Sequence, residues 1–212
     1  GAAVDEIEDP RPAAELLRQW STEHPEYAFL PRKFKIAVTG SPYDRAAIAF
    51  HDIGICTVRN DDGEIGYKIY IGGGLGRMPR IGRVLSEFIP KTQLLNYVDS
   101  IIHVYNRFGR RDNKHRARIK ILVDELGLNE TRRQIYEHYN SLKNESRLPS
   151  TDIIKFIMDE FSPPDFSTAR KYDLEKDFIS SLSLKNWAET NLTSHRDPNH
   201  VIVSVSLKKP GA

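Results

Sequence analysis

Cysteine is nearly absent from this chain, because Cys56 is the only one among its 212 residues. A single cysteine excludes an intrachain disulfide framework and any site that needs several thiolates from this chain. The sequence also lacks an apolar run of about 18 residues, the length that a membrane-spanning helix needs. Its first residues, GAAVDEIEDPRP, are acidic and lack the apolar stretch of a signal peptide. We therefore expect a cytoplasmic protein without membrane contact.

Several catalytic and metal-binding patterns are absent as well. The seven histidines are scattered, and the chain has no HExxH motif, no P-loop and no GxSxG motif. Metal-ligand spacing is therefore not found, and no motif supports a nucleophilic serine. Cys56 stands between Ile55 and Thr57 in a strand-like run, so we expect it to be a small core residue.

What the chain does have is the composition of a folded protein. Hydrophobic residues make up 39% and charged residues 28%, which is enough apolar material for a core in one or two domains. The formal net charge of +2 implies no anionic partner, but the charge is unevenly distributed. Between Arg107 and Lys120 the chain has seven Lys/Arg and one acidic residue, Asp112.

The periodicity of apolar residues predicts strands early in the chain and helices later. IGICTVRN (53–60), Asp61-Asp62-Gly63 and IGYKIYIG (65–72) have the pattern of a β-hairpin. The final strand has no partner in its own segment, which suggests a chain cut within a domain. Strands are predicted at 33–40, 53–60, 65–72 and 200–208, and helices at 13–20, 79–89, 91–108, 114–127, 130–144, 150–161 and 178–191.

Three stretches have residues suited to anion chemistry. In PRKFK (31–35), a strand would place Lys33 and Lys35 on one face. There the two ammonium groups could bind a small oxyanion, or they could be solvated positions on an exposed face of the sheet. IGGGLGR (71–77) follows a strand, and its glycines allow close backbone approach to a ligand or form a tight strand-to-helix connection. Pro79 stands where a dinucleotide fingerprint needs its last glycine.

The third stretch is the basic block, RFGRRDNKHRARIK (107–120). Its cations suit carboxylates or phosphates, and the same block is equally typical of a solvated helix face. Binding to nucleic acid is disfavoured, because Phe108 is the one aromatic residue interleaved with these charges.

Taken in chain order, these stretches resemble the sirohaem-containing nitrite/sulfite reductase family. The residues that carry the resemblance are LPRKFKIAVTGSPYDRAA (30–47), HDIG (51–54), IGGGLGR (71–77) and YNRFGRRDNKHRARIKILVDELG (105–127). It extends over about residues 13–145 and is specific, because the four motifs occur in the family's order and at its intervals. From about Phe178 the chain is more weakly similar to the start of the family's second ferredoxin-like repeat.

The resemblance implies an α+β fold, with an antiparallel sheet covered by helices on one side and followed by the start of a ferredoxin-like repeat. It implies sirohaem as cofactor, and this cofactor's many carboxylates match the cations and glycines of the chain. The implied domains are 1–30 (linker and helix), 31–161 (sirohaem-binding), 162–177 (linker) and 178–212 (incomplete ferredoxin-like segment).

The resemblance also implies residue roles. Lys33 and Lys35 would bind sulfite or nitrite and help to deliver protons, and lysine at position 35 favours sulfite. The residues implied to contact sirohaem are Arg32, Gly72, Gly73, Gly74, Arg110, Arg111, Arg118 and Lys120.

The family also uses a [4Fe–4S] cluster held by two cysteine pairs, and these are missing here. The chain thus resembles the centre of a longer reductase that receives electrons from ferredoxin or a flavoprotein subunit, and we expect it to be inactive alone. A nitrite reductase, or a non-catalytic module that binds a tetrapyrrole or nucleic acid, is the alternative.

Overall fold

The computed structural model of the protein describes residues 1–22, 24–142, 144, 149–163, 176, 179 and 181–207. The chain divides into two compact units, a larger one of Ile7–Phe161 and a smaller one of Gly1–Glu6 with Ser162–Ala212. The domain boundaries implied by the resemblance stay predictions, and most of the expected linker 162–177 lies outside the described residues.

Four strands form the sheet of the larger unit and lie in chain order: β1 (Ile36–Thr39), β2 (Ile53–Arg59), β3 (Ile65–Ile71) and β4 (Arg83–Pro90). β2, β3 and β4 pair antiparallel, whereas β1 joins β2 in parallel. The expected α+β class is confirmed, with a mixed sheet in place of a purely antiparallel one. The cause is the connection 40–52, which is long enough to return the chain to the same end of the sheet.

The predicted hairpin is confirmed, because β2 and β3 are joined by the turn at Asp61-Asp62-Gly63. Gly63 has φ of 81°, a conformation that favours glycine. Asn60 stabilises the turn by accepting a hydrogen bond of 2.8 Å on Oδ1 from the backbone N–H of Glu64.

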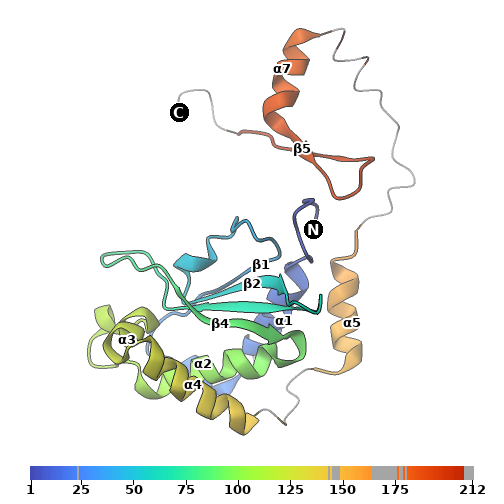
Figure 1. The fold of residues 1–212 in the computed structure, drawn as a ribbon. Helices are drawn as coiled ribbons and strands as arrows, with labels where there is room; N and C mark the ends of the chain where they lie inside the picture. Colours follow the sequence, from blue (N-terminus) through green and yellow to red (C-terminus); the bar gives the residue numbers. More distant parts are fainter. Residues whose placement is uncertain are drawn as a thin grey trace. The chain divides into compact units, whose positions relative to one another are not determined.

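The hydrophobic core lies on the face of the sheet that α2 (Leu94–Phe108) covers. The helix was predicted from its apolar stripe, and Leu94, Val98, Ile101, Ile102 and Tyr105 are all buried as that stripe requires. Figure 1 shows α2, α3 and α4 below the sheet. Burying each such side chain contributes about 1.5–3 kcal/mol, so this face supplies much of the stability.

The other helices of the larger unit are close to their predicted positions: α1 (Arg11–Thr22), α3 (Ile119–Leu126), α4 (Leu128–Leu142) and α5 (Thr151–Glu160). The helix expected over 114–127 begins later than predicted. A short 3-10 turn, η4 (Lys114–Arg116), comes first, and Arg118 has an extended backbone with ψ of 150°. The chain therefore changes direction at Arg118 before α3 starts.

The predicted helix at 79–89 is wrong, because most of this segment is strand β4. Its run Val84-Leu85-Ser86-Glu87-Phe88-Ile89 is too short for periodicity to separate a helix from a strand. The segment forms a strand because it pairs with β3 at the edge of the sheet. The glycine stretch is consequently a strand-to-strand connection and not a strand-to-helix connection.

The smaller unit contains α7 (Leu182–Asn191), β5 (Leu192–Ser194) and β6 (Val201–Val203). β6 pairs antiparallel with β5, so the prediction that the final strand lacks a partner is wrong. The partner strand directly follows the helix and is only three residues long, which leaves too little pattern to detect it. The strand predicted over 200–208 is shorter than expected, because it ends at Val203 and residues 204–207 are not in a strand. Lys208 lies outside the described residues.

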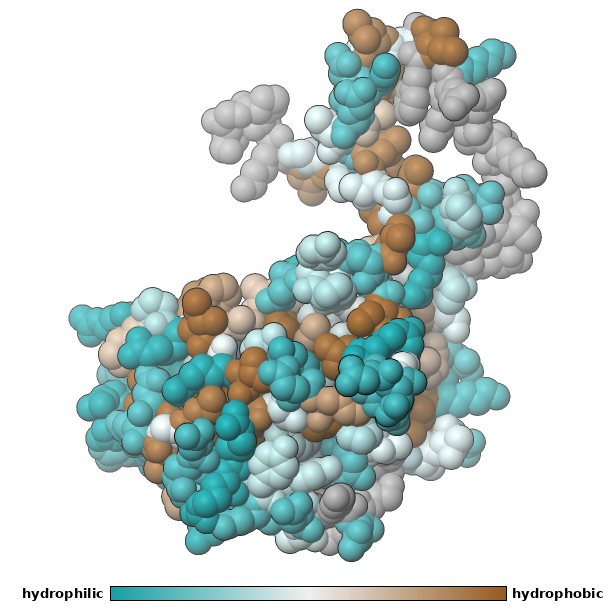
Figure 2. Space-filling view, viewed as in Figure 1, coloured by the Kyte–Doolittle hydropathy of each residue, from teal (hydrophilic) through white to brown (hydrophobic). Residues whose placement is uncertain are grey.

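Hydrophobic residues are interspersed with hydrophilic ones over the face that Figure 2 shows. No helix in the described part of the chain is long and apolar enough to cross a membrane.

Candidate functional site

The segment 31–35 leads into β1 and presents two lysines to solvent. Lys33 and Lys35 are exposed, whereas Arg32 and Phe34 are half-buried, so the predicted alternation is present although the strand itself begins at Ile36. The Phe34 ring lies 5.2 Å from the ring of Tyr105 on α2, which fixes the inner face of the segment. This anchoring directs the two ammonium groups outward.

The cations of this segment are free. Among the described residues, the side chains of Arg32, Lys33 and Lys35 make no hydrogen bond or ion pair, and the bonds of Arg32 and Lys35 use main-chain atoms only. Unpaired cations at neighbouring positions of one segment are available to bind an anion.

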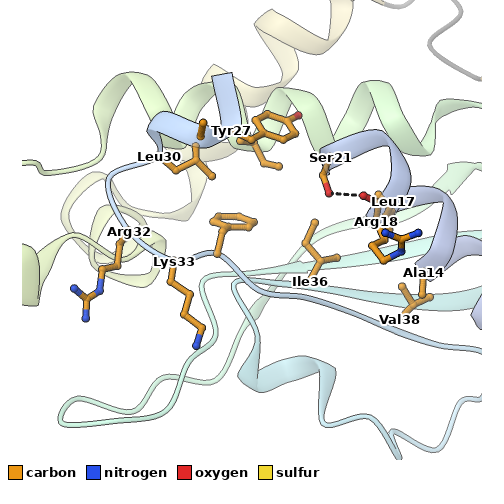
Figure 3. Close-up of a pocket in the computed structure, with 13 residues that line it drawn as sticks. Ala14, Leu17, Arg18, Ser21, Tyr27, Leu30, Arg32, Lys33, Ile36 and Val38 are labelled. Carbon is orange, nitrogen blue, oxygen red and sulfur yellow. Dashed lines mark hydrogen bonds between the residues drawn. The ribbon is translucent and has the colours of Figure 1, made fainter. Parts of the chain in front are cut away.

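A cavity of about 550 Å³ lies beside this segment, between α1, β1 and the 3-10 turn η1 (Pro25–Phe29). Figure 3 shows the charged ends of Arg32 and Lys33 at one end of the cavity, and Leu17, Ile36 and Val38 farther along it. The cavity thus has largely apolar walls, with Arg32 and Lys33 at one end and Arg18, which is paired with Glu15, at the other.

The glycine loop, 72–82, connects β3 to β4 and runs close to other backbone. Gly72 has φ of 79°, and a methyl group at Gly73 would collide with the carbonyl oxygens of Ala49 and His51. A methyl group at Gly74 would lie 3.0 Å from Nη2 of Arg118. The expected close backbone approach is therefore present, but in this structure it is an approach to the protein's own chain.

The loop is held from below by Lys120. This lysine is buried and donates hydrogen bonds from Nζ to the carbonyl oxygens of Leu75 at 3.0 Å and Met78 at 2.6 Å. Burial lowers the pKa of Lys120, and the neighbouring Arg118 lowers it further. The charge of Lys120 thus lies under the loop.

Most of the basic block is paired within the protein. Arg110 forms ion pairs with Asp112 at 2.6 Å and Glu125 at 3.6 Å. Arg111 donates to the carbonyl oxygens of Phe29 at 2.8 Å and Asn106 at 3.0 Å. These two cations are therefore engaged by the protein's own groups.

Asp52 links these segments, although it is not among the site residues predicted from the sequence. Its Oδ1 accepts hydrogen bonds from Arg118 at 2.8 Å and 3.2 Å, and its Oδ2 accepts one from the backbone N–H of Lys35 at 2.9 Å. Its main-chain oxygen accepts a further bond of 3.0 Å from Gly72. The side chain is fully buried.

The signal for Asp52 was visible in the sequence. A carboxylate directly before a buried strand must find a basic partner, because an unpaired buried charge is costly. Burial raises the pKa of Asp52, while hydrogen bonds from Arg118 act in the opposite direction.

The residues present fit an anionic, carboxylate-rich cofactor better than an iron–sulfur cluster. The lysine segment before β1 and the glycine loop after β3 lie at the same end of the sheet, because Ile36, Ile53 and Ile71 are in register there. Free cations next to close backbone are what a tetrapyrrole with many carboxylates requires. Cys56 is buried as predicted, and burial raises its thiol pKa. One inert thiol cannot supply the four thiolates of a [4Fe–4S] cluster.

Comparison with known proteins gives one consistent family. Residues 1–143 match the family described as "Nitrite and sulphite reductase 4Fe-4S domain". A protein named sulfite reductase (ferredoxin) 1, from Mycolicibacterium paratuberculosis, is 31% identical over 66% of this chain and 25% of its own length. A sulfite reductase (NADPH) hemoprotein beta-component from Leptospira biflexa is 35% identical over 57% of this chain and 23% of its own length.

The fold has a counterpart among solved structures. The structure of the Mycobacterium tuberculosis NirA protein matches with a TM-score of 0.59 at 24% identity, over 66% of this chain and 26% of that one. This likeness shows the fold. The chain spans about a quarter of the length of the curated relatives it matches.

Proposed function

Because the chain belongs to the nitrite and sulphite reductase 4Fe-4S domain family, we propose that it is part of a sirohaem-dependent sulfite reductase. The whole protein would reduce sulfite to sulfide with six electrons, and nitrite reduction to ammonia is the alternative. The names of both relatives, which include sulfite reductase, support sulfite. Since one name includes ferredoxin and the other NADPH, a ferredoxin or a flavoprotein subunit is the proposed electron donor.

The observation that carries the proposal is the pair Lys33 and Lys35, which are exposed and without partners among the described residues. Two free ammonium groups on one face of an extended segment bind an oxyanion and hold protons next to it. Each oxygen that leaves sulfite as water consumes protons, so donors at this place assist the reaction. We assign substrate binding and proton delivery to these two lysines.

Sirohaem is the proposed cofactor, and when bound it supplies the iron on which the anion is reduced. Arg32 is free to bind one of its carboxylates, and Arg118 presents the part of its guanidinium that Asp52 does not use. Gly72, Gly73 and Gly74 keep the adjoining backbone free of side chains. Arg110 is half-buried and Arg111 is exposed, but both are engaged within the protein, so they contribute less. Lys120 acts by holding the glycine loop.

No step is assigned to an iron–sulfur cluster in this chain. Its one cysteine is Cys56, and the proposed whole protein would need cluster ligands from elsewhere. We therefore propose that the 212-residue chain binds the cofactor and the anion but does not turn over sulfite by itself.

The test is a titration of the purified chain with sirohaem, followed by absorbance. We expect the bound cofactor to show a chlorin-like spectrum that shifts when sulfite is added. The variant Lys33→Gln/Lys35→Gln should keep the cofactor spectrum and lose the sulfite-induced shift. A matched control is Lys155→Gln, because Lys155 is an exposed lysine on α5.

Two results would reject the proposal. A folded chain that binds no sirohaem would remove the cofactor-binding role from these residues. A sulfite-induced shift that survives in the double lysine variant would remove the substrate role from Lys33 and Lys35. Salt-dependent binding of RNA without tetrapyrrole binding would favour the nucleic-acid alternative.

A further inference from the structure

Asp52 lies where three segments of the proposed site meet. Its carboxylate bonds to Lys35 and Arg118, and its main chain bonds to Gly72. These partners belong to the lysine segment, the basic block and the glycine loop respectively. Among the described residues, Asp52 is therefore bonded directly to all three of the segments that the proposed function uses.

We propose that Asp52 is the positioning residue of the site: its buried carboxylate sets the place of the Lys35 backbone and of the Arg118 guanidinium together. The inference rests on the proposed function for what the positioned groups bind. Asp52 is fully buried, so it acts through its two partners and not by direct contact from the surface.

The two oxygens of the Asp52 carboxylate accept hydrogen bonds from different segments. Oδ2 accepts the N–H of Lys35 at 2.9 Å, one residue before β1 begins, while the Lys35 carbonyl oxygen accepts the N–H of Ile53 at 3.2 Å. The lysine segment is thus held at its last residue by the side chain of Asp52 and by Ile53, the first residue of β2. A shift of this anchor would move both lysine side chains.

Oδ1 fixes Arg118 by accepting bonds from both Nε and Nη2. A guanidinium held at two nitrogens has a defined plane, and here it lies against Gly74. A methyl group added at Gly74 would lie 3.0 Å from Nη2, which is closer than an ordinary contact, so the guanidinium would have to move by a few tenths of an ångström. Asp52 and Gly74 together therefore determine where the unused edge of Arg118 is presented.

The Asp52 carboxylate interacts electrostatically with neighbouring groups, so its protonation can be followed in a pH titration. The titratable or charged groups that interact with it are Arg118, His51, Tyr105 and Lys120. Burial raises its pKa, so acidification removes the charge that Arg118 and the Lys35 N–H are bonded to.

The experiment compares Asp52→Asn with Asp99→Asn in the full chain. Asp99 is a matched control, since it is a buried carboxylate on α2 that accepts a bond of 2.8 Å from the Tyr27 hydroxyl. The first measurement is a ¹H–¹⁵N NMR titration of the Arg118 Nε–H and the Lys35 amide. In the wild type and in Asp99→Asn, the two signals should shift with one common midpoint, above the ordinary aspartate value of 3.8. In Asp52→Asn that common titration should be lost, and the Lys35 amide should exchange faster with solvent.

The second measurement is the sirohaem affinity of the same proteins. Asp52→Asn should bind sirohaem on the order of tenfold more weakly, the effect expected for a partner that orients binding groups. Asp99→Asn should bind like the wild type even if it loses as much stability. Equal affinity in Asp52→Asn, or an equal loss in Asp99→Asn, would overturn the positioning role.

The two measurements separate this inference from the proposed function. If the wild-type chain binds no sirohaem, the proposed function fails, and the NMR titration alone decides the role of Asp52. Independent titration of Arg118 and Lys35, or none, would then overturn it. If Asp52→Asn does not fold, the double variant Asp52→Asn/Arg118→Gln takes its place, because it removes both charges of the pair. The titration of the wild type tests the inference without any variant.

Discussion

Lys120 and Met78 are joined by a hydrogen bond of 2.6 Å from the lysine Nζ to the main-chain carbonyl oxygen. A second bond of 3.0 Å joins the same nitrogen to the carbonyl oxygen of Leu75. Both carbonyls belong to the glycine loop, so one buried charge holds the exposed tip of the loop against α3. The sequence alone would place this lysine among the groups that face a ligand.

Replacing Lys120 with methionine should therefore loosen the loop before it affects the rest of the fold. We expect faster hydrogen exchange at the amides of Gly74 and Arg80, which bond to each other's carbonyl oxygens across the loop. Global stability should fall by only about 1–2 kcal/mol, because Leu75 and Met78 are exposed residues whose released carbonyl groups can bind water. Lys114→Met is the control, since Lys114 is an exposed lysine of the same block; equal exchange in both variants would contradict the assignment.

Replacing Lys33 and Lys35 with glutamine should leave the stability of the fold within about 0.5 kcal/mol of the wild type. Both side chains are exposed and have no partner among the described residues, so their loss breaks no contact. Urea unfolding of the double variant measures this. A loss of more than about 1 kcal/mol would show that the lysines have a structural role.

The sequence predicts those parts of the molecule that depend on local pattern. α2 could be predicted because its apolar stripe is long and Gly109 follows its end. β4 could not, because its identity depends on pairing with β3 and not on its own residues. The free lysines could be predicted from alternation, but the contact of Asp52 with Arg118 joins positions 66 residues apart.

The same difference separates the two ends of the basic block. Asn113 caps the turn at η4 by accepting a bond from the His115 N–H at 3.0 Å, a contact between residues only two positions apart. Lys120 finds its partners 42 and 45 residues earlier in the chain, on a loop whose path depends on the sheet. Residue type therefore indicated an anion-binding region, while only the fold shows which cations are free.

Gly73→Ala and Gly76→Ala should differ in where they disturb the protein. A methyl group at Gly73 collides with Ala49, whose carbonyl oxygen also accepts the Gly82 N–H at 2.6 Å. The change should cost about 1–3 kcal/mol and raise hydrogen exchange at Gly82. Gly76 has φ of 100° with open space around it, so alanine there should cost about 1–2 kcal/mol from backbone strain alone. Unchanged exchange at Gly82 in Gly73→Ala would contradict this reading.

The stability of the larger unit should depend on pH through Asp52 in a direction opposite to that of most carboxylates. Burial raises the pKa of Asp52 above 3.8, so the folded state binds its proton more tightly than the unfolded state does. The resulting stabilisation is complete below about pH 3.8 and is lost as the pH rises through the folded pKa. It amounts to about 1.4 kcal/mol for each pH unit between the two pKa values.

Asp52→Asn should lack this dependence, so the free energy of unfolding of the wild type should fall relative to that of the variant as the pH rises from about 3 to 7. The pH-dependent contributions of the other carboxylates are the same in both proteins, so they cancel in the difference between the two free energies of unfolding. Asp9 is one of them: although burial opposes it, hydrogen bonds from Arg11 lower its pKa to about 2, so its contribution is present above 3.8 and lost as the pH falls through 2. Unfolding of the larger unit can be followed by Trp20 fluorescence in a Trp187→Phe background, because Trp187 lies in the smaller unit. A difference between the two proteins that stays constant, or grows in favour of the wild type with pH, would mean that Arg118 outweighs burial and holds Asp52 ionised throughout.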